Sequence, residues 1–388
     1  MGSHLPVINN RTSIPVSGQM AKLLTHPERA LNALVNPQRT APITVEIDLV
    51  NGICNSRCPN CTYPQGDGTR GTFFKWDRFS SLTGELKAAG VEGIVLKGGG
   101  EPTLYPRFEE AIRYLKNAGF DVGLITNGLR FNHEMAESVL PFLTWVRFSV
   151  DAGSEGMYEK THGLGEERFL KLQGNINAAC EIKKRDTLAT MVGASYLVLE
   201  SNLEDIDAAI EWGNSIGLSY IQFKPMQLRC PSAPGGYSYD YLTCATISQH
   251  LIQYQDKEYA NGFRVFLTRI ASPSQIERSS TCYGQRVSLS IGADGEIFVC
   301  CHKKYDPRWS VGSIYGSSFE EIIFSERRKK LLHLNPRQAD CLHGCRYDSF
   351  NTTLERSFAG QTPQETELRL RAMAADYEGQ SVLCPNHI

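Results

Sequence analysis

Six short runs of β-branched and other apolar residues alternate with longer amphipathic stretches between residues 43 and 225. This alternation is typical of βα units, which build a parallel sheet. We therefore expect an α/β fold, a partial (βα)6 barrel of the TIM type, whose active site lies at the carboxyl ends of the strands. The predicted strands are Ile43–Val50, Glu92–Lys97, Asp121–Thr126, Thr144–Val150, Met191–Leu199 and Ser219–Lys224, and helices are predicted at Pro106–Ala118, Glu167–Lys184 and Leu203–Ile216.

The chain of 388 residues is longer than the roughly 250 residues of one barrel, so we expect attached segments. The predicted parts are a covering segment 5–42 with a helix at Gln19–Val35, a barrel 43–230, a linker 231–281 with a helix at Tyr239–Tyr259 and a strand, a small α+β domain 282–350, and a helical tail 351–388. The small domain is expected to hold a β-hairpin over Arg286–Cys301 and a helix at Phe319–Leu334, and the tail a helix at Thr362–Tyr377.

Composition excludes several classes of protein. With 41% hydrophobic residues, 21% charged residues and a net charge of -2, the chain can bury a core and has no basic surplus for nucleic acid or anionic membranes. No apolar stretch approaches the 18 residues of a transmembrane helix, and no secretory signal is present. We expect a cytoplasmic protein with no nucleic-acid partner and no membrane association.

Twelve cysteines are unusual in such a chain, and a reducing compartment favours metal binding or catalysis over disulfides. Cys54, Cys58 and Cys61 lie within eight residues directly after the first predicted strand. Thiolates are the usual ligands of iron–sulfur clusters, and three of them leave one iron of a cubane open. The alternative is a zinc site, but zinc takes four donors and no local residue supplies the fourth.

Further polar and glycine-rich positions follow the other predicted strands. Gly98-Gly99-Gly100-Glu101-Pro102 follows the second strand, and Asn127 follows the third. Ser149 and Asp151 end the fourth, while Ser195 and Gln222 lie on the fifth and sixth. Because the carboxyl ends of parallel strands meet at one edge, these residues are expected around the cysteine loop.

The Cys-x-x-x-Cys-x-x-Cys spacing after the first strand of a βα barrel resembles the radical S-adenosylmethionine (radical SAM) superfamily, and residues 98–102 look like its GGE motif. The resemblance covers Ile43 to about Pro225. It implies a [4Fe-4S] cluster at Cys54, Cys58 and Cys61 with SAM at the open iron. It also implies a set of SAM-binding residues, namely Gly98, Gly99, Gly100, Glu101, Asn127, Ser149, Asp151, Ser195 and Gln222.

The chain departs from this family at Asn60, where many members carry an aromatic residue. Tyr63 is the expected substitute for the adenine contact. The resemblance implies that one electron, from a flavodoxin- or ferredoxin-type donor, cleaves SAM to a 5'-deoxyadenosyl radical. This radical removes a hydrogen atom from the substrate.

A second cysteine set lies in the last third of the chain. Cys282, Cys300, Cys341 and Cys345 can close a whole cubane, which leaves no iron free. The arrangement resembles the SPASM domain in its shortened twitch form, which implies one auxiliary [4Fe-4S] cluster. A four-cysteine zinc site is the alternative. Cys301 is an alternative to Cys300 as the fourth ligand. Adjacent residues of a strand point to opposite faces, so only one of the two thiols can face the cluster.

The sequence leaves the reaction open between three hypotheses. The first is dehydrogenation or epimerisation of a small hydroxylated or aminated metabolite of the aminoglycoside, aminocyclitol or sugar type. Epimerisation needs a hydrogen donor, for which Cys230 is the best-placed thiol, ahead of Cys301 and Cys384. The second is epimerisation or cross-linking of a ribosomal peptide, although about 40 residues before the first strand are few for a leader-binding domain. The third is a non-catalytic metal-binding protein.

Overall fold

The structure is a computed structural model of the whole chain. It describes residues 19–61, 71–225, 227–229, 237–239, 249–254, 257, 259–268, 279–333, 341, 345–375 and 387. Tyr63, Cys230 and Cys384, which the sequence singled out, lie outside the described residues.

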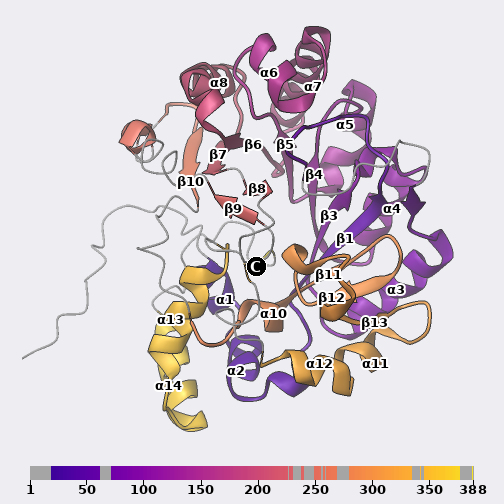
Figure 1. Cartoon of the computed structure of the whole chain (residues 1–388), viewed down its shortest axis with the longest axis vertical. Coiled ribbons are helices and arrows are strands. Elements are labelled where there is room, and N and C mark those ends of the chain that lie inside the picture. Colours follow the sequence, from indigo (N-terminus) through magenta and orange to yellow (C-terminus); the bar gives the residue numbers. More distant parts are fainter. Residues whose placement is uncertain are drawn as a thin grey trace, which may run out of the picture.

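Parallel strands form the centre of the molecule and confirm the predicted α/β partial barrel (Figure 1). The six predicted strands are all present and parallel to their neighbours, with ends within one or two residues of the expected ones. They are β1 (Thr44–Asn51), β3 (Gly93–Gly99), β4 (Asp121–Thr126), β5 (Trp145–Ser149), β6 (Met191–Val198) and β7 (Tyr220–Pro225).

Both edges of this sheet are extended by later parts of the chain. At one edge β10 (Arg264–Leu267) adds a parallel strand to β7. At the other edge β11 (Ser288–Ile291) runs parallel to β1, and β12 (Glu296–Phe298) and β13 (Ser310–Ser313) follow antiparallel. The predicted hairpin is therefore correct, and it continues the barrel sheet. Short strand β2 (Thr72–Phe73) pairs with β1, and β8 (Gln227–Arg229) with β9 (Tyr237–Tyr239).

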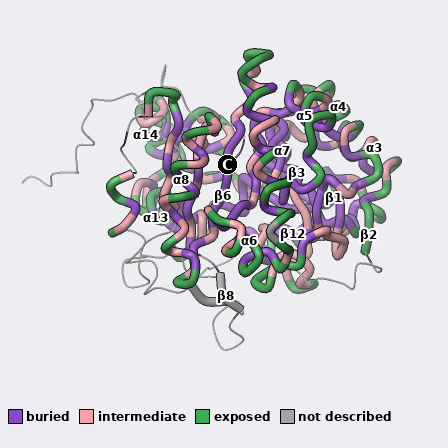
Figure 2. Tube along the Cα trace, turned by 90° about the horizontal axis from the view of Figure 1, so that it is seen from above, coloured by how far each residue is buried: buried purple, intermediate pink, exposed green. Residues whose placement is uncertain are grey.

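Helices cover the outer face of the sheet, with buried residues inside and exposed ones on the rim (Figure 2). They are α3 (Trp76–Ala88), α4 (Phe108–Asn117), α5 (His133–Val139), α6 (Glu155–His162), α7 (Glu166–Arg185) and α8 (Ile206–Ser215). Short 3-10 helices lie at Pro37–Arg39, Pro102–Leu104, Leu140–Phe142, Glu200–Asp205, Cys301–Lys303 and Pro307–Trp309.

Two predicted long helices are divided in the structure. The expected helix at Gln19–Val35 is α1 (Gln19–Leu24) followed by α2 (Pro27–Val35), because Pro27 lacks an N–H and begins a new helix. The expected helix at Phe319–Leu334 is α11 (Phe319–Ile323) followed by α12 (Glu326–Leu331). Ser325 separates them, since its side chain accepts a hydrogen bond from Arg328 N and caps α12.

The two ends of the described chain pack together. Helices α1 and α2 share a second apolar core with α10 (Gly284–Val287), α13 (Asp348–Phe358) and α14 (Pro363–Ala375). Helix α14 matches the predicted tail helix, and α13 crosses the expected boundary at residue 350. Tyr239 belongs to strand β9, so the helix predicted from this residue is wrong there, whereas residues 249–254 are helical.

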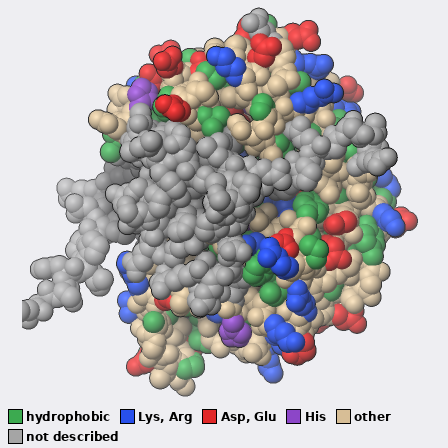
Figure 3. Space-filling view, in the orientation of Figure 1, with side chains coloured by type: hydrophobic (Ala, Val, Ile, Leu, Met, Phe, Trp, Pro, Cys, Tyr) green, Lys and Arg blue, Asp and Glu red, His purple; other side chains and the backbone are tan. Residues whose placement is uncertain are grey.

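The described helices include none that is long and apolar enough to cross a lipid bilayer. In Figure 3 acidic and basic side chains are interspersed over the described part of the visible face, in keeping with the near-neutral net charge. The absence of a nucleic-acid partner stays a prediction.

Candidate functional site

The cysteine loop begins where β1 ends. Gly52 adopts a positive φ of 76°, which turns the chain away from the sheet, and Cys61 N donates to Cys58 O at 3.1 Å. Cys54 and Cys58 are half-buried and Cys61 is exposed. Burial raises the pKa of Cys54 to about 11, and the neighbouring Glu101 and Cys61 add to it.

The arrangement of these thiols fits a multi-iron cluster. Burial raises the pKa of Cys58 far above its ordinary value, and the negative charges of Asp151, Cys61 and Cys54 act in the same direction. The three thiols are therefore near enough to interact electrostatically, and bound iron would stabilise them as thiolates. Among the described residues, no group of three or more His, Cys, Asp or Glu side chains is arranged to hold a single metal ion.

The glycine loop after β3 interlocks with the cysteine loop. Gly52 N donates to Gly99 O at 3.0 Å, and Glu101 N donates to Ile53 O at 2.9 Å. A side chain on Gly100 would collide with the backbone of Ile53, so only glycine permits this approach. The two motifs are thus brought into direct contact, as the sequence predicts.

The Glu101 carboxylate is buried and accepts hydrogen bonds from neighbouring residues. Its Oε1 accepts hydrogen bonds from Thr103 N at 3.0 Å, Thr103 Oγ1 at 2.7 Å and Thr126 Oγ1 at 2.6 Å. Its Oε2 accepts from Asn127 N at 2.8 Å. Burial raises the pKa of Glu101, and these donors oppose the rise. The carboxylate therefore braces the glycine loop, and its contact with an ammonium group stays a prediction.

Asn127 lies against the cysteine loop. Its Nδ2 donates to Asn55 Oδ1 at 2.7 Å and approaches Cys54 Sγ at 3.7 Å, while its Oδ1 accepts from Leu129 N at 3.1 Å. The structure therefore assigns its side chain to shaping the loop around Cys54.

Ser149, Ser195 and Gln222 form one row across β5, β6 and β7, because they are register partners. Ser195 is buried, and Gln222 Oε1 accepts a hydrogen bond from Arg147 Nη1 at 2.9 Å. This row brings together three of the residues expected near SAM.

Asp151 follows β5 with a positive φ of 50° and is buried. Leu197 N donates to its Oδ1 at 2.7 Å. Burial raises the pKa of Asp151 to about 7, against the lowering effects of this bond and of the charge on Lys224. His162 Nε2 lies 3.9 Å from Asp151 Oδ2, and burial lowers the pKa of His162 to about 4. The imidazole is therefore neutral near pH 7.

Sequence reasoning missed a buried ionic network on the inner side of β1. Glu46 pairs with Lys97 at 2.6 Å and with Arg346 at 2.9 Å, and its exposure is 3%. Asp48 pairs with Lys304 at 2.5 Å, with both side chains 1% exposed. The sequence does carry a signal for this network, because Glu46 and Asp48 lie at alternate positions of a strand in a parallel sheet. Buried charges require partners of opposite charge, so basic residues are expected nearby.

The second cysteine set also comes together. Burial raises the pKa of Cys300 well above its ordinary value, and the nearby Cys301, Cys345, Cys282 and Cys341 contribute. Asn351 Nδ2 approaches Cys282 Sγ at 3.8 Å, and Cys345 N donates to Asp348 Oδ2 at 2.8 Å. Cys301 is also near this group, so which of Cys300 and Cys301 is the fourth ligand is not decided by these interactions, and Cys300 stays the prediction.

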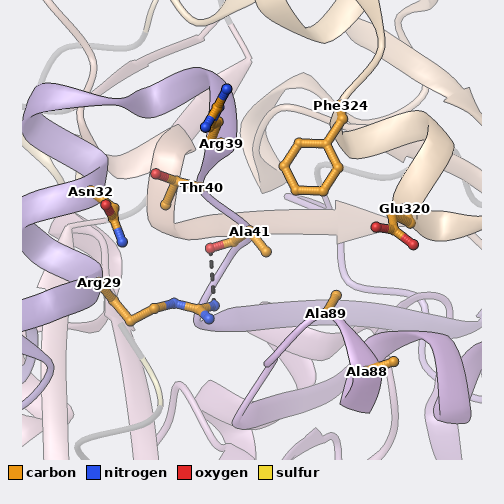
Figure 4. Close-up of a pocket in the computed structure, with 9 residues that line it drawn as sticks. All are labelled: Arg29, Asn32, Arg39, Thr40, Ala41, Ala88, Ala89, Glu320 and Phe324. Carbon is orange, nitrogen blue, oxygen red and sulfur yellow. Dashed lines mark hydrogen bonds between the residues drawn. The ribbon is translucent and has the colours of Figure 1, made fainter.

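A separate hollow of about 230 Å³ lies far from these motifs (Figure 4). Thr40 and Ala41 precede β1, and Ala88 and Ala89 end α3 before β3, so the hollow faces the amino ends of the strands. Arg29 enters it, with Nη2 donating to Ala41 O at 3.1 Å. The hollow is therefore not the predicted SAM site.

Two family models match separate parts of the chain. The family model described as "Radical SAM superfamily" matches residues 49–213, and the SPASM model, described as "Iron-sulfur cluster-binding domain", matches residues 282–346. The chain contains a radical SAM domain and a SPASM domain. These two domains imply [4Fe-4S] clusters and a SAM site, as the sequence predicts.

Individual relatives are distant. Mycofactocin maturase MftC of Mycobacterium ulcerans is 24% identical over 328 residues, which cover 80% of this chain and 82% of MftC. SuiB of Streptococcus suis bound to its precursor peptide SuiA aligns with a TM-score of 0.58 and 16% identity, covering 78% and 69% of the two chains. The protein anSMEcpe with bound AdoMet and the Kp18Cys peptide aligns with a TM-score of 0.58 and 15% identity, covering 87% and 100%. The two structural likenesses show the shared fold.

Proposed function

We propose that this radical SAM enzyme cleaves SAM reductively and oxidises a polar substrate by removing a hydrogen atom, an electron and a proton. The main support is the interlocking of the cysteine and glycine loops through the Gly52–Gly99 and Ile53–Glu101 hydrogen bonds. This contact between the two loops supports a single cofactor site at the carboxyl ends of β1 and β3. When bound, the first cluster with SAM supplies a 5'-deoxyadenosyl radical and the auxiliary cluster supplies an electron acceptor.

The proposal assigns a role to each group of predicted site residues. Cys54, Cys58 and Cys61 hold the first cluster, and the backbone of Gly98–Gly100 receives the methionine part of SAM. Ser149 and Asp151 contact the ribose or methionine part from the end of β5, and Ser195 and Gln222 continue this surface. Cys282, Cys300, Cys341 and Cys345 hold the auxiliary cluster. A flavodoxin- or ferredoxin-type protein is the electron source.

The substrate is a small hydroxylated or aminated metabolite in the first version of this proposal. Support comes from the inner side of the barrel strands, which carries Glu46, Asp48, Lys97, Arg147 and Gln222. Charged and amide side chains in a buried setting favour a ligand with many hydrogen-bonding groups. Loss of hydrogen from a carbinol or amine carbon, followed by an electron and a proton, then yields a carbonyl or imine.

A peptide substrate is the second candidate. The observation that favours it is that both structural neighbours, SuiB and anSMEcpe, have been solved with bound peptides. In this version the same cofactors act on a side chain or an α-carbon of a peptide.

The experiment uses extract from cells grown in deuterium oxide, so that every metabolite and peptide carries carbon-bound deuterium. Reconstituted protein, SAM and dithionite are added under anaerobic conditions, and 5'-deoxyadenosine is analysed by mass spectrometry. We expect 5'-deoxyadenosine to form and to gain deuterium from the extract. Signal that survives protease digestion of the extract indicates a small metabolite, and signal that disappears indicates a peptide. No 5'-deoxyadenosine would refute the proposal and favour the non-catalytic hypothesis.

Oxidation and epimerisation differ in the mass of the product. Oxidation removes two hydrogens, whereas epimerisation in deuterium oxide leaves one solvent deuterium on carbon. If epimerisation occurs, Cys230→Ala is expected to abolish it, while unchanged turnover would exclude Cys230 as the hydrogen donor.

A further inference from the structure

The SPASM domain reaches into the barrel through the segment that follows Cys300. Lys304 Nζ lies 2.5 Å from Asp48 Oδ2, and Tyr305 Oη donates to the same oxygen at 2.7 Å. Asp48 is on β1, more than 250 residues away in sequence, and is fully buried. Five residues after an auxiliary-cluster cysteine, the chain is therefore anchored to the strand that leads to the first cysteine loop.

Tyr305 also lies against the glycine loop. A Cβ atom built on Gly99 would lie 2.4 Å from Asn51 Oδ1 and 3.0 Å from Tyr305 Oη. A Cβ atom built on Gly292, at the hairpin turn of the SPASM domain, would lie 3.2 Å from Tyr305 Cε1. The ring thus occupies the space between two glycines, one from each domain.

The backbone at Tyr305 is strained. Its φ of 63° is in the left-handed region, which residues other than glycine, asparagine and aspartate rarely adopt. Such a conformation persists only where the surroundings enforce it. Here the enforcing contacts are the hydrogen bond to Asp48 and the ring of Phe298, 5.8 Å away between centroids.

The glycine loop is consequently held from two directions. On one side the cysteine loop binds it through Gly52 N to Gly99 O and through Glu101 N to Ile53 O. On the other side the hydroxyl of Tyr305, together with the side chain of Asn51, fills the space where a side chain on Gly99 would lie. Without this second contact, the backbone of Gly99 gains freedom, which SAM would have to remove on binding.

We propose that Tyr305 is a positioning residue through which the SPASM domain fixes the conformation of the Gly98–Glu101 loop and thereby sets the affinity for SAM. The proposal rests on the proposed function, in which this loop binds SAM. Tyr305 acts through Gly99 and need not touch SAM itself. The auxiliary domain is then part of the SAM site as well as the holder of a second cluster.

The test is the dissociation constant of SAM, measured by anaerobic equilibrium dialysis with labelled SAM on the reconstituted full-length protein. We expect Tyr305→Ala to bind SAM about tenfold more weakly, and Tyr305→Phe about threefold to fivefold, as expected for one lost hydrogen bond. The matched control is Tyr315→Ala, since Tyr315 is 41% exposed on the same domain and its hydroxyl meets Lys75 N. The control should bind SAM as the wild type does.

Iron content and melting temperature are measured for each variant, so that lost folding is separated from lost affinity. If Tyr305→Ala does not retain its iron, Tyr305→Phe decides, because it keeps the size of the side chain and removes only the hydroxyl that bonds to Asp48. Wild-type affinity in every variant that retains its iron would overturn the inference and leave the proposed function intact. A wild-type protein that binds no SAM would overturn both.

Discussion

Replacing Gly100 by alanine should disrupt the contact between the two cofactor loops. The new Cβ atom would lie 2.2 Å from the carbonyl oxygen of Ile53, whereas ordinary contacts begin near 3.4 Å. One of the two backbones must therefore move by roughly 1 Å. Overpacking of this kind costs about 1–3 kcal/mol. Loss of the Glu101 N to Ile53 O hydrogen bond adds about 1 kcal/mol, so the expected destabilisation is about 2–4 kcal/mol.

The assay is thermal unfolding of the reconstituted protein under anaerobic conditions, with the SAM dissociation constant measured in parallel. Gly84→Ala is the matched control, because Gly84 is exposed within α3 and an added Cβ would meet nothing within 4 Å. Alanine there should stabilise the helix by about 0.5–1 kcal/mol. The two substitutions should thus shift the melting temperature in opposite directions. A Gly100→Ala protein with wild-type stability and wild-type SAM affinity would refute the reasoning.

Three further predictions concern other parts of the molecule. Glu46→Ala removes the buried carboxylate that pairs with Lys97 and Arg346, and should lower the free energy of unfolding, measured by chemical denaturation, by about 3–5 kcal/mol. Glu367→Ala removes one member of an exposed pair and should lower it by less than about 1 kcal/mol. Equal losses would contradict a buried network. Burial lowers the pKa of His162 to about 4, so its contribution to stability is complete above pH 6.5 and declines as the pH falls toward 4. His162→Gln should therefore flatten the loss of stability between pH 6.5 and 5, and an unchanged pH profile would contradict this. Cys300→Ala should lower the iron content by about four atoms per chain, and Cys301→Ala should leave it unchanged; the reverse result would make Cys301 the ligand.

The sequence predicts those parts of the site that are made by neighbours in the chain. The spacing of Cys54, Cys58 and Cys61 and the run Gly98–Glu101 are local, and the alternation of strands and helices places both at one edge of the sheet. Strand ends were accurate for the same reason, since the side chains on the helix side of a strand are apolar at every second position, as Val45, Ile47 and Leu49 of β1 are.

The contacts between the domains could not be predicted in this way. Strand β11 pairs with β1, and Tyr305 and Arg346 reach Asp48 and Glu46 across more than 250 residues. The spacing of apolar residues predicts strands and helices, but it does not predict which distant segments pair. The division at Ser325 was missed because the apolar spacing continues through it, although its capping side chain was visible in the sequence.

The most direct test of the account is Mössbauer spectroscopy of protein reconstituted with ⁵⁷Fe, with and without SAM. We predict that SAM changes the signal of a single iron per chain, the one that Cys54, Cys58 and Cys61 leave open, and that Cys58→Ala removes this response. A spectrum that SAM does not alter, or a response that persists in Cys58→Ala, would contradict it.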